Sequence, residues 1–483
     1  MNSGLTAWLR GATPRTGAAQ RKGGAGAGAG AGAGVSLVQL RVPAMPVDRA
    51  LAALAGVDGE AVMLWDPPSG PAFAGCGRAA GLEVDHAGID GLRERARELW
   101  AGVETVAFDG EGPPPLLFGG LAFAPGAGAA KPWTAFGEGS FELPRLRYSV
   151  DAGQAYLMVA APSSRGLDGL VDAAEPALAA LERAAKAGDA PAGGAAAFAP
   201  TAPPGHRIEQ LPAARFTAIV DEILAGIATG RFAKVVAARR AEVVADRPFE
   251  VLAVLGRLRA AAEGCVRFAL SRGGSTLCGV TPERLVDRQG SAIRTEALAG
   301  TVALSGPEGA DAAASAARLA GSAKDREEHA LVVEEIARRL ALLCERLDVA
   351  TAPRTRALRH VLHLLTPIEG QLREPLPHVL DLARALHPTP AVGGLPAAEA
   401  IDFIVGREPA ARGWYAGPVG WFDAAGDGSL MVALRCAVLE GPRAWLWTGA
   451  GIVAGSRADE EYAETAVKQR AMLVGLGLDE GAR

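Results

Sequence analysis

The segment that most constrains the fold is residues 275–301, which read STLCGVTPERLVDRQGSAIRTEALAGT. Its two runs at 275–280 and 292–298 are rich in the apolar and β-branched residues that favour strands. A Gln-Gly pair before the second run is a hairpin-turn signal, and Pro282 ends the first run because its ring fixes the backbone. The segment therefore predicts antiparallel strands with Glu283 just beyond a strand end.

Each end of this segment has a structural and a functional interpretation. Most glutamates are solvated, so Glu283 is either a surface carboxylate or a functional group placed by a strand end. The second run finishes at Ala299-Gly300-Thr301, where a glycine lets a ligand approach the backbone. The segment by itself favours the surface interpretation of Glu283.

Composition excludes several classes of protein. The 483 residues exceed what one hydrophobic core usually supports, and 49% hydrophobic with 21% charged residues is typical of a globular chain. A net charge of -5 gives no electrostatic footprint for nucleic acid or an acidic membrane. No apolar run approaches the twenty or so residues of a membrane span. The five cysteines form no CxxC pair, which indicates a cytoplasmic protein without a thiolate metal site or disulfide framework.

The chain divides into three parts by composition. Residues 1–35 end in a Gly/Ala tract that cannot bury a core, and they are predicted to be a disordered tail. Residues 36–205 show mixed helical and strand-like patterns and end in a Gly/Ala/Pro-rich stretch. Residues 206–483 carry the sharper motifs.

Lys234 lies in an apolar, strand-forming run that follows a predicted amphipathic helix over residues 215–230. A lysine in such a run is either an edge-strand residue that prevents aggregation or a partly desolvated amine that can act as a base. The sequence leaves these two interpretations open.

A helix predicted over residues 324–347 carries Asp325 and Glu328 in its first turns, on nearly the same face. The helix dipole accounts for Asp325. Glu328 lies on the apolar stripe four residues before Val332, and a carboxylate that points inward needs a partner. This requirement makes Glu328 a candidate ligand.

A last helix is predicted to begin at Ser456, after a Gly-rich loop, with Glu461, Glu464 and Lys468 on one face. Glu464 and Lys468 could form only a surface ion pair. However, backbone N–H groups of the loop and the helix N-terminus form a natural anion site. Two helix-borne carboxylates beside it suggest a divalent cation, and oxygen-only ligands favour Mg²⁺ over zinc.

Residues 412–441 predict a β-hairpin with its turn at residues 424–428. Arg435 is expected inside an apolar strand, and Tyr415 adds an aromatic hydroxyl. Together they form either a carboxylate clamp or, for Arg435, an inter-strand ion pair.

Taken together, the motifs resemble those of the chorismate-utilising enzymes, and in particular the isochorismate synthases of menaquinone and siderophore biosynthesis. The resemblance is strong over residues 215–476 and weak in the N-terminal half, through FGGLAFAP and AFGEGSFELPRL. The strings that carry it are FAKVVAARR, GVTPERLV, EALAGT, KDREEHALVV, LHPTPAVGGLP, RGWYAGPVGWFD, VALRCAVL, TGAGIV and EEYAETAVKQ.

This resemblance implies an α/β (α+β) fold with large stacked antiparallel β-sheets flanked by helices, in which both halves share one unit. The stretch near residue 195 is then an inserted surface loop. The implied reaction is the Mg²⁺-dependent isomerisation of chorismate to isochorismate, by water addition at C2 and loss of the C4 hydroxyl.

The resemblance also implies a role for each candidate residue. Lys234 would be the general base and Glu283 the general acid. Glu328 and Glu464 would bind Mg²⁺, with Asp325 and Glu461 as outer-shell partners. The implied substrate-binding residues are Gly449, Gly451 and Lys468 for the ring carboxylate, Tyr415 and Arg435 for the enolpyruvyl carboxylate, and Gly300, Thr301, His363 and Ala391 in the pocket. His363 could equally be a packed core histidine.

Three positions discriminate among branches of the family. Anthranilate-type enzymes have glutamine at the place of Lys234, aminodeoxychorismate synthases have lysine at that of Ala299, and salicylate synthases usually have threonine at that of Ala391. The residues present favour isochorismate synthase, with no glutamine amidotransferase subunit. Salicylate synthase remains the alternative, because salicylate forms when isochorismate loses pyruvate in the same pocket. A non-catalytic regulatory paralogue is the other, although the proposed acid, base and metal ligands are all present.

Overall fold

The computed structural model describes residues 34–59, 61–86, 88–108, 112–187, 205–261, 264–304, 312–358 and 361–478. The predicted tail, except its last two residues, and the Gly/Ala/Pro-rich stretch at 188–204 lie outside these described residues. The chain forms two compact units. The first contains the described residues up to Phe118, those from Ser140 to 187, and Ala269–Ser271. The second contains Gly119–Gly139, residues 205 to Phe268, and the chain from Arg272 onward.

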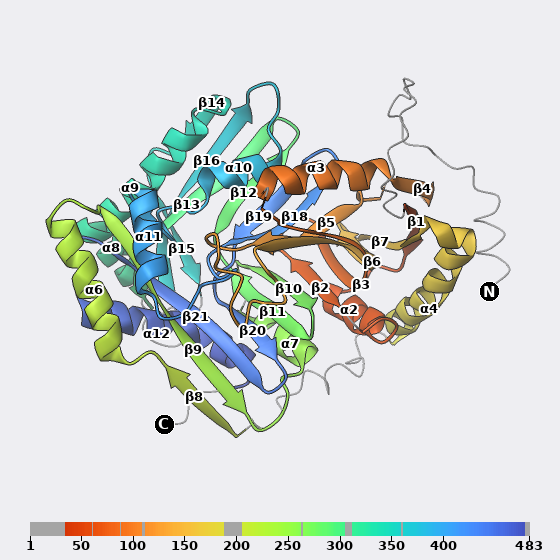
Figure 1. The fold of residues 1–483 in the computed structure, drawn as a ribbon, viewed down its shortest axis with the longest axis horizontal. Helices are drawn as coiled ribbons and strands as arrows, with labels where there is room; N and C mark the ends of the chain where they lie inside the picture. Colours follow the sequence, from red (N-terminus) through yellow and green to blue (C-terminus); the bar gives the residue numbers. More distant parts are fainter. Residues whose placement is uncertain are drawn as a thin grey trace. The chain divides into compact units, whose positions relative to one another are not determined.

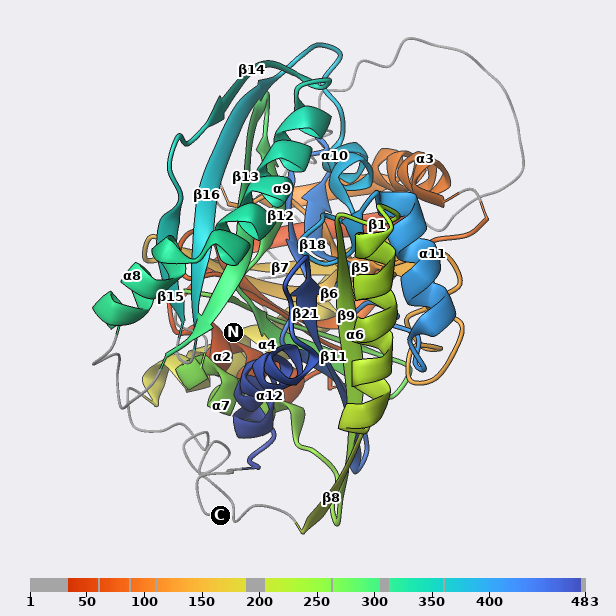
Figure 2. The same cartoon turned by 90° about the vertical axis from the view of Figure 1, so that its left-hand side faces the viewer.

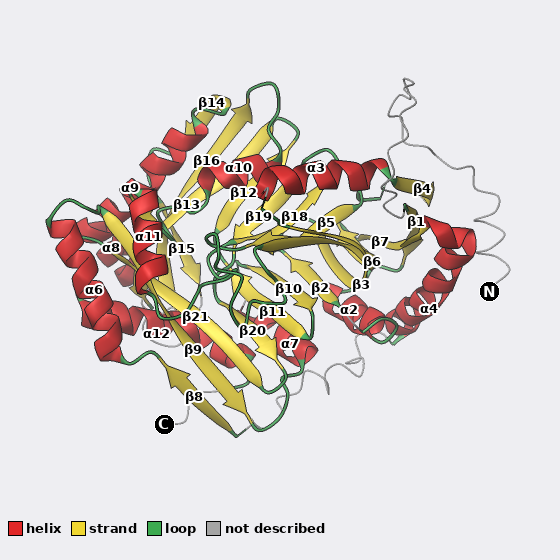
Figure 3. Ribbon diagram, viewed as in Figure 1, coloured by secondary structure: helices red, strands yellow, loops and turns green. Residues whose placement is uncertain are grey.

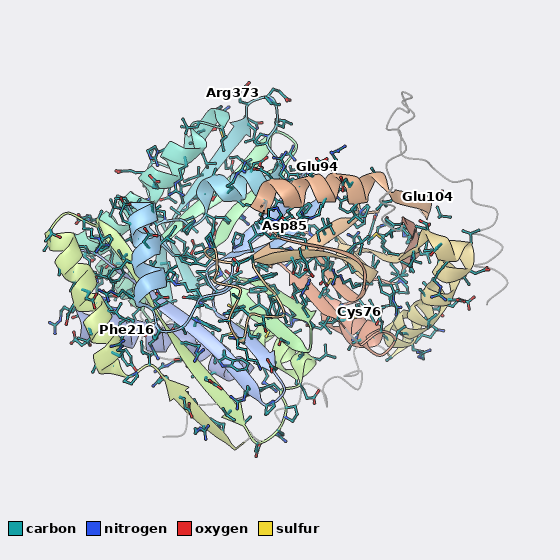
Figure 4. The ribbon with its side chains drawn as sticks, viewed as in Figure 1. Cys76, Asp85, Glu94, Glu104, Phe216 and Arg373 are labelled. Carbon is teal, nitrogen blue, oxygen red and sulfur yellow. The ribbon has the colours of Figure 1, made fainter. Side chains whose placement is uncertain are left out.

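The first unit is built on one sheet with the strand order β4-β1-β7-β6-β3-β2. All its neighbouring strands are antiparallel except β1 and β4. Helix α4 packs on β1 and β7, and α2 packs on β3. Cys76, labelled in Figure 4, lies buried in β3. The elements are β1 (Val35–Val42), α2 (Val47–Ala55), β2 (Val62–Asp66), β3 (Ala72–Glu83), α3 (Gly88–Ala101), β4 (Val103–Phe108), β6 (Gly139–Asp151), β7 (Gln154–Pro162), η1 (Ser163–Arg165) and α4 (Gly166–Lys186).

The second unit contains two runs of paired antiparallel strands (Figure 1). One has the order β8-β9-β21-β20-β11, and the other the order β18-β19-β12-β13-β16, with β14 and β15 paired to β16. Their bounds are β8 (His206–Gln210), β9 (Lys234–Ala245), β11 (Ser275–Thr281), β12 (Arg284–Gln289), β13 (Ala292–Ala303), β14 (Cys344–Val349), β15 (Arg354–Leu358), β16 (Val361–Leu372), β17 (Gly394–Leu395), β18 (Pro418–Asp423), β19 (Gly428–Val432), β20 (Cys436–Glu440) and β21 (Arg443–Ile452). Strands β5 (Leu116–Leu121) and β10 (Val266–Arg272) complete the set in the described residues.

Helices of the second unit cover these strands (Figure 3). Helix α6 lies along β9, α12 packs on β21, and α9 packs on β13 (Figure 2). Their bounds are α6 (Ala213–Ala228), α7 (Val251–Ala261), α8 (Ala312–Gly321), α9 (Ala323–Leu340), α10 (Val379–Leu386), α11 (Ala397–Arg407) and α12 (Ala458–Gly475). No helix in the described part of the chain combines the length and apolarity needed to cross a membrane.

Helix α6 shows why the sequence pattern produces this packing. Phe216, Ile219, Val220 and Ile223 recur at helical spacing and are all buried. Phe216, labelled in Figure 4, contacts the ring of Tyr462 on α12 at a centroid distance of 5.6 Å. The predicted amphipathic helix is confirmed, with both ends about two residues earlier.

Residues 275–301 form three strands rather than the two predicted. The Gln-Gly turn joins β12 to β13, whereas β11 pairs with β20. Strand β13 contains a bulge between Ala299 and Thr301, where Gly300 has a φ of 73°. A Cβ atom there would lie 3.1 Å from the carbonyl oxygen of Asp325, so the bulge requires glycine for space as well as for conformation. The bulge brings β13 close to the start of α9.

The helix predicted over residues 324–347 is wrong at its C-terminal end. Helix α9 stops at Leu340, and the following residues turn and form β14. Leu342 is 74% exposed, so the apolar stripe does not continue beyond the helix end. Pairing of β14 with β16 outweighs the helical propensity of this segment.

Three further predictions need correction. Helix α12 begins at Ala458, and Ser456 accepts a hydrogen bond from the Val453 N–H (3.2 Å) instead of capping the helix. Gly449 and Gly451 lie within β21, paired with β9, rather than in a loop, because the strand continues to Ile452. Arg435 lies between β19 and β20 with a φ of 45°, outside any strand, because the chain bends there.

Candidate active site

The second unit contains a cavity that is partly open to solvent, with about 750 Å³ of space outside the protein atoms when the open solvent in its mouth is included. Its walls come from β9, β13, β16, β21, α9, α12 and the loops that connect other strands. Most of the predicted site residues therefore meet in one place. The predicted residues that line it are Glu283, Gly300, Thr301, Glu328, His363, Ala391, Tyr415, Arg435, Gly449, Gly451, Glu464 and Lys468.

Three predicted residues do not line this cavity. Lys234 lies behind its wall, where it contacts Glu328. Asp325 and Glu461 line a neighbouring cavity, which shares Glu328 and Glu464 with the first. The two shared glutamates therefore lie at the boundary between the cavities.

Glu283 is a buried acid rather than a surface carboxylate, since its exposed fraction is 4%. It lies in the turn between β11 and β12, where its carbonyl accepts a hydrogen bond from the Val432 N–H (3.0 Å). The Thr389 hydroxyl approaches its carboxyl oxygen Oε1 at 3.4 Å. Burial raises the pKa of Glu283 to about 8, with a further rise from the charge of Glu296 that Lys234 partly opposes. The carboxyl group therefore holds its proton at neutral pH.

Lys234 begins β9, and its side chain is completely buried. It is paired with Leu395 of β17, so it is not an exposed residue on an edge strand, and that interpretation is wrong. Its Nζ lies 2.8 Å from Glu328 Oε1, but the amine has no well-aligned hydrogen bond to any described residue. A buried amine with unused hydrogen-bonding capacity is compatible with a functional role.

Acidic and basic side chains alternate where the two cavities meet. Lys468 forms the predicted ion pair with Glu464 (2.6 Å) and also donates to the Gly449 carbonyl at 3.1 Å. Lys324 donates to Glu461 at 2.6 Å. Burial opposes the charge on Lys324, but the bond to Glu461 and the nearby carboxylates of Glu328 and Glu464 raise its pKa overall. Lysine charges therefore balance this acidic cluster.

The oxygen atoms of this cluster make it a candidate site for a magnesium ion. Glu328 and Glu464 offer only oxygen atoms, and in the described residues no three His, Cys, Asp or Glu side chains come close enough to enclose a metal by themselves. Mg²⁺ typically uses one or two carboxylates and completes its shell with water or substrate. Gly451 leaves room for the Glu328 and Lys234 side chains, since a Cβ atom there would collide with Glu328 Oε1 and approach Lys234.

His363 connects two of the predicted substrate-binding residues. Its Nε2 lies 3.2 Å from Arg435 Nη2, and its Nδ1 lies 3.0 Å from the Thr301 hydroxyl. Burial and the charges of Arg435 and Lys468 hold its pKa well below the usual range, so the ring is neutral. Because Arg435 can only donate, Nε2 accepts and Nδ1 carries the proton. His363 is therefore both a packed, buried histidine and a residue of the cavity wall.

Arg435 and Tyr415 present a cation and a hydroxyl to the cavity. Arg435 lies outside any strand, so the inter-strand ion pair is wrong. Burial raises the pKa of Tyr415, whose ring stacks on Trp447 at 6.4 Å. Arg435 and the neighbouring lining residue Ala416 both have positive φ angles, of 45° and 63°. Such backbone conformations are costly for residues other than glycine and cluster at functional sites.

Sequence reasoning missed several lining residues. Trp447 precedes Gly449 and Gly451 by steps of two along β21, so strand periodicity could have placed it on the same face. Thr389 could not have been found, because its contact with Glu283 depends on tertiary packing. The missed lining residues are Val236, Pro282, Leu298, Val392, Ala416, Leu434, Trp447 and Thr448.

Comparisons with known proteins agree with this geometry. Residues 31–477 match the family model described as "Chorismate binding enzyme". The chain is 36% identical to the Pseudomonas aeruginosa protein named "Salicylate biosynthesis isochorismate synthase", over 86% of each chain. It is 32% identical to "Isochorismate synthase MenF" of Bacillus subtilis, over 85% of this chain and 87% of the relative. The solved menaquinone-specific isochorismate synthase MenF of Escherichia coli superposes with a TM-score of 0.72 at 26% identity, over 98% of this chain and 99% of that one. This likeness confirms the expected mixed α/β fold.

Proposed function

The chain belongs to the family of chorismate binding enzymes, and we propose that it is an isochorismate synthase, an isomerase that converts chorismate to isochorismate. The observation that carries the chemistry is Glu283, a buried carboxyl in the cavity wall whose pKa of about 8 keeps it protonated at neutral pH. The reaction adds water at C2 of the ring and removes the C4 hydroxyl, so it needs one group that accepts a proton and one that donates it.

Glu283 would be the proton donor. A departing hydroxide is a poor leaving group, and a proton delivered to the C4 oxygen lets it leave as water. The turn that carries Glu283 is held at the Val432 N–H, and its carboxyl meets the Thr389 hydroxyl. Because burial raises its pKa, Glu283 is in the protonated form that this step requires.

Lys234 would be the proton acceptor for the attacking water. Its amine is buried and lacks an aligned hydrogen bond to any described residue. When the amine is charged it lowers the pKa of Glu283, so the two groups lie near enough to interact electrostatically. To serve as base, the amine must be neutral and must reach a water through the wall beside Glu328.

The positive groups of the cavity suit a dianionic substrate. Arg435 and Tyr415 would bind the enolpyruvyl carboxylate, and Lys468 with the β21 backbone at Gly449 and Gly451 would bind the ring carboxylate. Gly300, Thr301, His363 and Ala391 would shape the remaining wall. The small Ala299 side chain leaves no amine nucleophile at that position, which supports water as the nucleophile and a chain that works without an amidotransferase subunit.

Glu328 and Glu464 would hold Mg²⁺, with Asp325 and Glu461 in the outer shell. A bound magnesium ion would supply positive charge for the ring carboxylate in a site whose own carboxylates would otherwise repel it.

The product of the reaction tests the proposed function. We expect the purified chain to convert chorismate, in the presence of Mg²⁺, to isochorismate alone, as measured by chromatographic separation of the products. Neither ammonia nor a partner subunit should be needed. Formation of salicylate with pyruvate would instead assign the chain to the salicylate synthases. A strict requirement for ammonia would assign it to the anthranilate-type enzymes.

Removal of divalent metal is expected to abolish turnover. EDTA should reduce isochorismate formation to background and an excess of Mg²⁺ should restore it, because the carboxylate pair would otherwise face the substrate carboxylate. Calcium-chelating EGTA with Mg²⁺ present serves as the control and should leave the rate unchanged. Full activity in EDTA would contradict the assignment of Glu328 and Glu464 as metal ligands.

A further inference from the structure

A buried carboxylate outside the cavity wall holds the turn that carries Glu283. Glu296 lies on β13 and is 6% exposed. Arg356 of β15 donates from the same Nη1 atom to Glu296 Oε1 and to the Pro282 carbonyl, at 2.7 Å each. Through Arg356, Glu296 therefore fixes the residue that comes just before Glu283.

Glu296 also contacts the residue that comes just after Glu283. The Arg284 N–H lies 3.4 Å from Glu296 Oε1, and the Arg284 guanidinium lies 3.5 Å from Oε2. Both neighbours of Glu283 in the chain are thus tied to one carboxylate on the adjacent strand. Neither Glu296 nor Arg356 lines the cavity, so neither is placed to touch the substrate.

The charge of Glu296 acts on Glu283 as well. Burial is the main reason for the raised pKa of Glu283, and the negative charge of Glu296 raises it further. Lys234 on β9, Lys468 on α12 and the Thr389 hydroxyl act in the opposite direction. Other charged or titratable groups face this region from neighbouring elements: Arg284 with its ion-pair partner Asp287 (2.7 Å) on β12, Arg356 on β15, His363 on β16, Tyr415 and Arg435.

We propose that Glu296, together with Arg356, is a positioning residue for the proton donor, which fixes the turn at residues 282–284 and helps to keep the Glu283 carboxyl protonated. This inference rests on the proposed function. Glu296 has two effects on Glu283: it holds the turn, and its negative charge favours the protonated carboxyl. Substitution can separate these effects, because Arg356 contributes only to holding the turn. The turn depends on both partners, whereas the negative charge belongs to Glu296 alone.

The test compares pH profiles of kcat for chorismate conversion in Glu296→Gln and Arg356→Gln. Both variants should lower kcat roughly ten- to a hundredfold with little change in KM, because a small displacement of the acid is costly for the chemical step. Only Glu296→Gln should move the alkaline limb of the profile to lower pH, since loss of its charge lowers the pKa of Glu283. Arg356→Gln keeps that charge and should not lower the limb.

Glu369→Gln is the matched control, because Glu369 lies on β16 and pairs with Arg294 of β13 at the surface (3.6 Å). Glu369→Gln should leave both kcat and the alkaline limb of the pH profile unchanged. Glu296→Asp, which retains the charge, should keep the alkaline limb near its wild-type position. Glu296→Ser, which also lacks the charge, replaces Glu296→Gln if the latter does not fold. A wild-type kcat in Glu296→Gln, or a reduced kcat with an unmoved limb, would overturn the proposal.

A second readout separates this inference from the proposed function. The carbonyl band of the protonated Glu283 carboxyl can be followed by infrared difference spectroscopy against Glu283→Gln, without any substrate. Its midpoint should lie at lower pH in Glu296→Gln than in wild type. If wild type makes no isochorismate but this shift occurs, the function fails and the inference about Glu283 stands. If wild type makes isochorismate and the midpoint does not shift, only the inference fails.

Discussion

Replacing Glu283 by glutamine is expected to lower kcat for isochorismate formation by about 10²- to 10⁴-fold, the usual contribution of a general acid. Glutamine has nearly the same shape and can keep the contact with the Thr389 hydroxyl, but it has no proton to give. The substrate should still bind, so KM should change little. Stopped-time product analysis and near-ultraviolet circular dichroism would check activity and fold together.

The same substitution should have a distinctive effect on stability. The pKa of Glu283 is raised from 4.5 to about 8 in the folded chain, so its contribution to stability is complete below pH 4.5 and is lost as pH rises through 8. Glutamine carries no such penalty. Glu283→Gln should therefore match wild type near pH 5 and exceed it at pH 9, by an amount on the order of a few kcal/mol.

Urea unfolding at several pH values would measure this difference. Glu334→Gln is a suitable control, since Glu334 is an exposed residue of α9, and its stability relative to wild type should not change with pH. A Glu283→Gln chain with near-wild-type turnover would exclude Glu283 as the proton donor. A stability difference that does not grow with pH would show that the wild-type carboxyl is not held in its protonated form.

Replacing Lys234 by alanine should have a comparable effect on turnover, a loss of about 10²- to 10⁴-fold, because the proposed base is removed. It also leaves Glu328 without its ion-pair partner at 2.8 Å. Loss of one member of a buried pair typically costs about 3 to 5 kcal/mol, so some loss of stability is expected with the fold retained. Steady-state kinetics and thermal unfolding would report the two effects.

Two comparisons make this experiment specific. Lys234→Gln, which retains a polar group beside Glu328, should recover stability without recovering turnover. Lys131→Ala, at a position that is 76% exposed and paired only weakly with Glu440 (3.8 Å), should leave both unchanged. Turnover near the wild-type level in Lys234→Ala would rule out Lys234 as the base.

The sequence predicted the parts of the site that depend on local pattern. A proline after an apolar run predicts the strand end before Glu283. Helical spacing predicts which residues share a face of α9 and of α12. These signals put Glu283 at a strand end and Glu328 and Glu464 on helices, and the family resemblance assigned the three to one site, whose cavity they do line. Their catalytic and metal-binding roles remain predictions.

Other features depend on contacts between distant segments, and no local pattern carries them. Residues 344–349 have helical character yet form β14, because β16 offers an unpaired edge. Arg435 adopts a left-handed conformation that only the surrounding fold can impose. The pairing of Glu296 with Arg356 joins residues sixty positions apart, which a single sequence cannot reveal.

The lysines among the carboxylates have a consequence for how the chain handles a cation. Lys324 already pairs with Glu461, and Lys468 pairs with Glu464, so two carboxylates of the cluster have an ammonium partner before any metal binds. A divalent cation held by Glu328 and Glu464, as proposed, would have to displace the ammonium group of Lys468 from Glu464, and the contact it broke would reduce its binding energy. Such a site would take up and release its metal as the surrounding concentration changes.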